Sequence, residues 1–204
     1  MGERRVVRKM LRRMESGEPV RVSRAFPTTT RLARLAAVAQ RFGYAYADVR
    51  RGGGPRGDGY LIVIVPDPSP EARARAERNR QRYPRAAAGG ELPRVAPEAV
   101  ELLKARITFD IAAMYSDRQL ILLCAVAAVP LALPLGLLLG SGVWEAVLTG
   151  VFWAALMAFV PLGLAANRRY RTRYAAILRS AGFTPVTDPS GRTRYVPSAG
   201  RLAH

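Results

Sequence analysis

Hydrophobic and polar positions divide the chain sharply at its centre. Residues 119–140 and 143–166 are almost continuously apolar, and Glu145 is the one charged side chain between positions 119 and 167. A membrane-spanning helix needs about 20 predominantly apolar residues, and both stretches reach that length. Because only a short tip separates them, they predict an antiparallel hairpin of two transmembrane helices within residues 118–167.

Small residues recur at every fourth position in both predicted spans. They are Ala128, Ala132, Gly136 and Gly140 in the first span and Ala146, Gly150, Ala154 and Ala158 in the second. Small side chains at this spacing let helix backbones approach closely in lipid. The two stripes therefore predict helix packing, either within the hairpin or between copies. A chain rich in alanine also produces such stripes by chance, so both interpretations stay open.

Charge predicts the orientation of the hairpin. Residues 1–118 carry 24 Lys and Arg against 13 Asp and Glu, and residues 168–204 carry 8 Arg against one Asp. Positive residues next to a span are retained on the cytoplasmic side, so we expect both termini in the cytoplasm and the protein in the plasma membrane. The residues expected at the lipid headgroups are Arg118, Trp144, Arg168, Arg169, Tyr170 and Arg171.

Residues 1–90 alternate between helical and strand periodicities and predict a small cytoplasmic α/β module. Residues 3–16 have one apolar face and several basic positions, which suits either packing on the module or contact with anionic lipid. Further helices are expected over 30–42 and 70–83. Strands are expected near residue 20 and over 44–50 and 60–65; the last is apolar throughout, as in a central strand covered on both faces.

Residues 91–117 form a linker and a predicted helix that opens at Pro97. Ser116 and Gln119 have the spacing of a capping box, which predicts that this helix ends there and that a new one begins. Residues 168–204 predict a helical extension followed by a β-hairpin over 183–196. We expect this hairpin to pack on the N-terminal sheet and extend it, with Phe183 and Val186 supplying the apolar contacts. The fold class is thus a transmembrane helical hairpin with an α/β (α+β) domain that the C-terminal β-hairpin completes.

The composition offers little for catalysis. The single cysteine, Cys124, lies in a predicted span and the single histidine is His204, so no thiolate or imidazole metal site is expected. Asp48, Asp58 and Asp67 are scattered, and no nucleophile–base pair can be assembled. Residues 52–57 match G-x-G-x-x-G, but a strand follows where a dinucleotide site needs a helix. We therefore expect no enzymatic activity, cofactor or small-molecule substrate.

Three functions remain open at this stage. The first is a membrane-anchored interaction or regulatory protein whose cytoplasmic domain binds a protein partner or a second copy. The second is an oligomeric pore-forming or lysis-type hairpin. The third is a membrane tether for nucleic acid, which the net charge of +17 motivates without any supporting motif.

Overall fold

The computed structural model describes residues 2–24, 28–53, 59–139, 142–189 and 191–197. The chain forms two compact units. Unit 1 combines Met1–Ile111 with Tyr174–His204, and unit 2 is Ala112–Arg173. Helices and two small antiparallel sheets both contribute to the fold, which agrees with the mixed fold class expected from the sequence.

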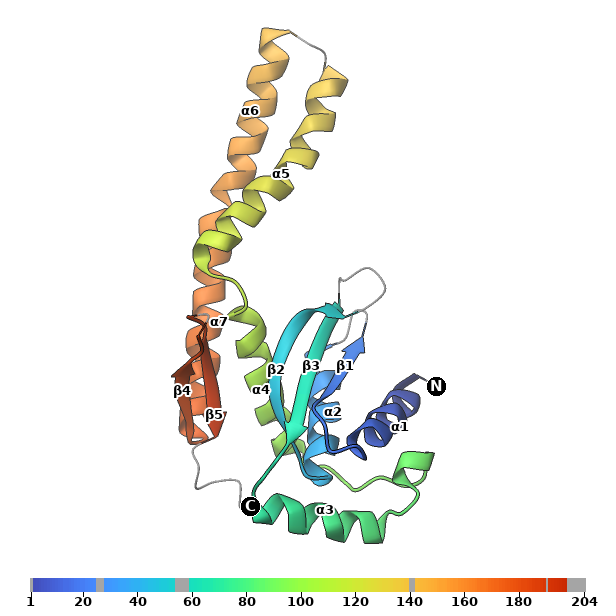
Figure 1. Cartoon of the computed structure of the whole chain (residues 1–204). Helices are drawn as coiled ribbons and strands as arrows, with labels where there is room; N and C mark the ends of the chain where they lie inside the picture. Colours follow the sequence, from blue (N-terminus) through green and yellow to red (C-terminus); the bar gives the residue numbers. More distant parts are fainter. Residues whose placement is uncertain (1, 25–27, 54–58, 140–141, 190, 198–204) are drawn as a thin grey trace. The chain divides into compact units, whose positions relative to one another are not determined.

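A three-stranded antiparallel sheet forms the centre of unit 1 (Figure 1). Its strands are β1 (Val20–Arg24), β2 (Tyr44–Gly53) and β3 (Gly59–Pro66), in the order β1-β3-β2. The prediction that the apolar strand is central is therefore confirmed. Ile62 and Ile64 are fully buried, whereas their neighbours Leu61 and Val63 are half-buried. The expectation that both faces are covered is thus wrong for one face, which stays partly open.

Four α-helices of unit 1 surround or flank this sheet. They are α1 (Gly2–Met14), α2 (Thr29–Arg41), α3 (Pro70–Arg82) and α4 (Pro97–Ala112), with a short 3₁₀ helix at Ala86–Ala88. The apolar face of α1 is buried at Val7, Met10, Leu11 and Met14. Of the two interpretations of this helix, packing on its own domain is therefore the one observed. Helix α2 packs on β2 and β3 and buries Leu32, Leu35, Ala36 and Ala39.

Gly43 joins α2 to β2 at a close approach. Its φ of 82° is in the left-handed region, which favours glycine. A Cβ at this position would lie 2.9 Å from the Cβ of Ala76 on α3. The glycine therefore ends α2, as its position after the apolar pattern predicts, and also lets α3 pack against the turn.

The C-terminal hairpin belongs to unit 1, as expected, but it does not extend the central sheet. Strands β4 (Phe183–Thr187) and β5 (Thr193–Pro197) form a separate two-stranded sheet. Val186, a predicted apolar contact, is 48% exposed, whereas Tyr195 on the opposite strand is buried. The hairpin is therefore attached through β5 and Phe183, and mostly by side chains rather than by backbone pairing.

Unit 2 consists of α5 (Asp117–Leu139), α6 (Val143–Ala158) and the beginning of α7 (Val160–Ser180). Helices α5 and α6 lie side by side and run in opposite directions (Figure 1). At the start of α5 the Ser116 amide donates to Gln119 Oε1 at 2.9 Å, and the Gln119 amide donates to Ser116 Oγ at 3.2 Å. The capping box is confirmed, and it starts a new helix as predicted.

Among the described residues, one helical stretch is long and apolar enough to be a candidate membrane span. It is Ala146–Ser180, which comprises most of α6 and all of α7. The first predicted span meets the same criteria only when Asp117–Val129 is joined to Pro97–Ala112, across a bend of 68°. The structure thus supports one candidate span, and the two-span hairpin stays a prediction.

Candidate functional site

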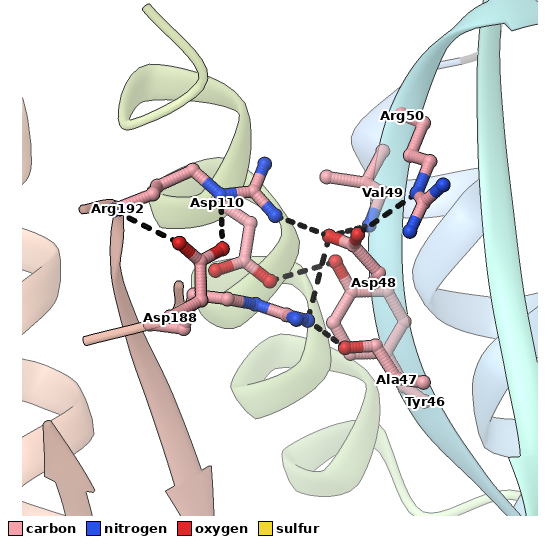
Figure 2. A network of polar contacts seen from close by, with 9 residues as sticks. Tyr46, Ala47, Asp48, Val49, Arg50, Asp110, Asp188 and Arg192 are labelled. Atoms are coloured by element: carbon pink, nitrogen blue, oxygen red, sulfur yellow. Dashed lines mark hydrogen bonds and ion pairs between the residues drawn. The ribbon is translucent and has the colours of Figure 1, made fainter. Parts of the chain in front are cut away.

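A cluster of charged side chains lies inside unit 1, where β2, α4 and the C-terminal hairpin meet (Figure 2). We call it the charged cluster; its members are Tyr46, Asp48, Arg106, Asp110, Arg192 and Arg194. Asp110 is 1% exposed and Arg106 is 5% exposed. Charged side chains are almost never buried to this degree unless they are paired. The cluster is therefore the feature of unit 1 that most needs a physical explanation.

A β-bulge in β2 places the two strand residues of the cluster. Tyr46 is paired with Ile64 and Asp48 with Val63, so the register shifts at Ala47. A bulge inserts one unpaired residue and changes the face to which later residues belong. Val49 consequently joins Ile62 on the core face and is fully buried.

The carboxylate of Asp48 gathers donors from both ends of the chain. Its Oδ1 accepts hydrogen bonds from Arg192 Nη2 at 2.7 Å and from the Val49 amide at 2.8 Å. Its Oδ2 accepts from Arg50 Nε at 3.2 Å, and Arg194 forms an ion pair with Oδ1 at 3.4 Å. Because Asp48 and Arg192 are 144 residues apart, this pair joins the N-terminal sheet to the tail.

The side chains of the tail complete the cluster. Arg194 Nη2 donates to the Ala47 carbonyl, which belongs to the residue that the bulge leaves unpaired. Burial lowers the pKa of Arg192, but the charge and hydrogen bond of Asp48, together with the charges of Asp110 and Asp188, outweigh it, so that the pKa is raised overall. Arg192 is thus held more firmly in its charged form, as the partner of a buried carboxylate should be.

Asp110 and Tyr46 form the deepest part of the cluster. The Tyr46 hydroxyl donates to Asp110 Oδ2 at 2.8 Å. Burial raises the pKa of Asp110, and the hydrogen bond from Tyr46 and the charge of Arg106 partly oppose this rise. Burial and the neighbouring Asp110 carboxylate raise the pKa of Tyr46 well above its ordinary value. Tyr46 therefore keeps its proton and acts as a permanent donor to Asp110.

Arg106 connects this pair to the hairpin. Its guanidinium carbon lies 4.9 Å from the centre of the Tyr46 ring and 5.7 Å from that of Phe183, within the range of cation–π attraction. One turn away, Phe109 packs edge-to-face on Tyr195 with ring centres 4.9 Å apart. Burial lowers the pKa of Arg106. Helix α4 therefore holds β2 and the hairpin through one cation and one aromatic pair.

The charged cluster contains three arginines and two aspartates. Two of the arginines, Arg192 and Arg194, form ion pairs with Asp48. Arg106 Nε and Asp110 Oδ1 have no hydrogen-bond partner within the part of the chain that is described. Buried ion pairs of this kind repay their desolvation only when the geometry is good. The arrangement joins three segments of unit 1: β2, α4 and the C-terminal hairpin.

Sequence reasoning found Asp48 but did not connect it with other residues. Of the other two aspartates considered, Asp58 lies outside the described residues, and Asp67 caps a turn by accepting from the Ser69 amide at 3.0 Å. The sequence of α4 contains a signal that could have predicted the buried charges. Arg106 and Asp110 are one turn apart and adjoin the apolar positions Ile107 and Leu103, so part of the buried face had to be polar.

The residues predicted to pack helices in lipid fall into three groups. Ala128 on α5 is buried, whereas Ala146, Gly150, Ala154 and Ala158 on α6 are exposed. A Cβ added at Gly150 would meet no atom within 4 Å. The side chains of Ala132 and Gly136, and the whole of Gly140, lie outside what the structure describes. The α6 stripe therefore does not face α5, and packing between copies stays a prediction.

The predicted headgroup residues are found on the surface. Arg118, Arg168, Arg169, Tyr170 and Trp144 are exposed, and Arg171 is half-buried. Arg168 Nη2 forms an ion pair with Asp117 Oδ2 at 2.6 Å, and Asn167 Nδ2 donates to the Ala112 carbonyl at 3.4 Å. These contacts join α7 to the start of α5, at the end of the apolar stretch where the predicted headgroup arginines gather.

Within the described residues, no group of three or more His, Cys, Asp or Glu side chains could hold a metal ion. No protein-family model, curated protein or solved structure matches the chain. The site is therefore interpreted from its own geometry.

Proposed function

We propose that this protein is a membrane-anchored interaction or regulatory protein, in which unit 2 is the anchor and unit 1 is the cytoplasmic domain. The observation that carries the proposal is the exposed surface of unit 2. Large apolar side chains there are mostly uncovered: Leu122 is 66%, Val126 60%, Val151 61%, Phe159 69% and Leu162 66% exposed. Soluble monomers rarely expose extended apolar patches, whereas helices facing lipid do so along their length.

The charged residues around these helices support one orientation. Arg118, Arg168, Arg169 and Arg171 are near the start of α5 and in the early part of α7, and Trp144 is at the opposite end of α6. Basic residues next to a span favour the cytoplasmic side, and tryptophan favours an interface. We therefore place both termini, and with them unit 1, in the cytoplasm.

Unit 1 is better suited to binding than to catalysis. The contacts of Asp48 with Arg192 and Arg194 hold the tail to the sheet, as a rigid scaffold requires. The partner we expect is a protein or a second copy of the chain, and no catalytic step is assigned to the domain.

A second candidate, an oligomeric hairpin protein, is favoured by one observation. The small-residue stripe on α6 is exposed and its Gly150 has open space beside it. Close helix contacts between copies would use such a surface. This candidate keeps the same anchor but places the function in the membrane helices.

The orientation is tested by labelling cysteines in intact cells with a membrane-impermeant maleimide, in a Cys124→Ala background. Val143→Cys and Val186→Cys are suitable positions because they are 81% and 48% exposed. We expect labelling at position 143 from outside and at position 186 only after the cells are opened. The reverse pattern would refute the cytoplasmic placement, and release of the protein by alkaline carbonate would refute the anchor.

The partner is tested by crosslinking in cells, mild solubilisation and affinity capture of the tagged full chain. We expect a protein partner in amounts comparable to the chain. Oligomers that crosslink only through α6 favour the second candidate, and nuclease-sensitive nucleic acid favours a tether and refutes the first proposal.

A further inference from the structure

Unit 1 contains an open groove of about 680 Å³ that the charged cluster does not use. It is formed by α1, α2, the segment after the 3₁₀ helix and the start of α4. Its apolar lining consists of Val7, Leu35, Val38, Leu92, Val95 and Val100. Sites for small ligands are mostly apolar concavities of about 300–1,000 Å³ that carry a few polar groups, and the groove has this size and character.

The polar lining of the groove has one sign of charge. Arg4 on α1 and Arg34 on α2 complete the lining as far as the structure describes it, and none of these described lining residues is acidic. Neither arginine has an ion pair or hydrogen bond with another described side chain. Two other grooves of unit 1 differ in this respect, because each is lined by Glu15 as well as Arg80. The groove of Arg4 and Arg34 is thus suited to an anion.

The apolar surface of the groove is aliphatic and partly uncovered. Val7 and Leu35 form a buried floor, whereas Val38, Leu92 and Val95 are only half-buried. None of the described residues that line the groove is aromatic, so these residues offer a nucleobase or flavin no ring on which to stack. An alkyl chain needs no directional partner and gains from contact with aliphatic side chains.

We propose that this groove binds a long-chain fatty acid, with the alkyl chain along the aliphatic lining and the carboxylate at Arg4 and Arg34. The planar guanidinium offers paired donors that match a carboxylate. The proposal does not depend on the membrane anchor, because every lining residue belongs to unit 1.

The experiment uses the full chain in phosphatidylcholine nanodiscs and a fatty acid that carries a diazirine in its alkyl chain. After irradiation, labelled peptides are mapped by mass spectrometry. We expect labels on residues 5–8, 35–41 and 92–100, in addition to any labels on unit 2 that arise from the bilayer. The matching diazirine fatty alcohol has the same chain without the charge, and it should label these groove peptides about tenfold less, because a charge-assisted hydrogen bond is lost.

Variants separate the groove from non-specific partitioning. Arg4→Gln with Arg34→Gln should reduce groove labelling by the acid about tenfold and leave unit 2 labelling unchanged. Arg31→Gln is the control, because Arg31 is exposed on the same helix but does not line the groove. If the double variant fails to fold, competition on the unaltered chain replaces it: excess oleate should remove groove labelling and excess oleyl alcohol should not.

Two outcomes would overturn the proposal. One is groove labelling that is equal for the acid and the alcohol or insensitive to the arginine substitutions. The other is labelling confined to residues 112–173. Neither outcome bears on the anchor, which the topology experiment tests separately.

Discussion

Units 1 and 2 differ most in where they place charged and apolar side chains. Unit 1 encloses Asp110 and Arg106 at 1% and 5% exposure, whereas unit 2 leaves Leu122 and Trp144 at 66% and 78% exposure. Charges are costly inside a protein unless they are paired, and large apolar groups are costly in water. In unit 1, charged side chains from distant segments of the chain pair with one another and offset the cost of burying charge. The described part of the second unit leaves these apolar side chains uncovered, and this is the observation behind the proposed membrane anchor.

The comparison also explains why the tail belongs to unit 1. Asp48 has one strand neighbour, Arg50, but its two less exposed arginine partners come from the C-terminal hairpin: Arg192 directly precedes β5, and Arg194 is in it. Removing one partner of a buried pair leaves a charge without compensation, and this costs more than the pair contributes. The two ends of the chain are therefore expected to fold together, and loss of either should weaken both.

The largest expected effect comes from Asp48→Ala. This change removes the carboxylate that Arg192 and Arg194 share, so that Arg192 keeps only its longer ion pair with Asp188 at 3.5 Å. We expect the free energy of unfolding to fall by about 3–5 kcal/mol. Glu77→Ala is the matched control, because its ion pair with Arg80 at 3.7 Å is about 60% exposed on both sides and should contribute less than about 1 kcal/mol. Limited proteolysis with increasing urea measures both. Equal sensitivity would show that the charged cluster does not hold the tail.

A second pair of variants replaces one exposed valine by arginine in each unit. Val151 on α6 and Val186 on β4 are 61% and 48% exposed. Val151→Arg should oppose membrane insertion by about 2.5–3.5 kcal/mol, because an arginine would face lipid. Val186→Arg should change stability by no more than about 0.5 kcal/mol, because its side chain faces water. Membrane fractionation and protein abundance in cells measure the contrast, and a tolerated Val151→Arg would contradict the lipid assignment.

A smaller effect is expected at Tyr46. Tyr46→Phe removes the hydrogen bond to Asp110 and should cost about 1–3 kcal/mol. The pKa of Tyr46 in the folded protein lies well above the 10.0 of an unperturbed tyrosine. Its contribution to stability is therefore fully present below pH 10 and is lost as the pH rises through the folded pKa. Urea unfolding between pH 8 and 11 should show a shallower alkaline decline in the variant, and an unchanged decline would contradict the buried donor.

Much of the fold was predictable because its signals are local. Helix and strand periods predict most of the helices and strands of unit 1, the Pro and Ser residues before α3 predict its start, and the capping box at Ser116 and Gln119 marks the new helix. The bulge at Ala47 was not predictable, because simple alternation in residues 44–50 keeps Tyr46 and Asp48 on one face and leaves Val49 on the other. The structure instead pairs Val49 with Ile62 on the core face.

The candidate site was less predictable than the fold, since its members are distant in the sequence. Arg106 and Asp110 lie in the helix expected from Pro97, and Arg192 and Arg194 in the expected hairpin, but none of the four was predicted as a site residue. Whether such residues are solvated or buried depends on which segments meet, and periodicity carries no information about that. The prediction that Val186 supplies an apolar contact is wrong for the same reason, because the face of a lone hairpin is not fixed by its pattern.

The central claim, that the exposed apolar side chains of unit 2 face lipid while unit 1 faces water, is tested most directly by spin-label accessibility. Labels are attached at Val126→Cys, Val151→Cys and Val186→Cys in a Cys124→Ala background, in bilayers. Collisions with oxygen, which concentrates in lipid, and with a water-soluble nickel chelate are then compared. We expect oxygen to dominate at positions 126 and 151 and the nickel chelate at 186. Nickel collisions at 126 and 151 as frequent as those at 186 would contradict the account.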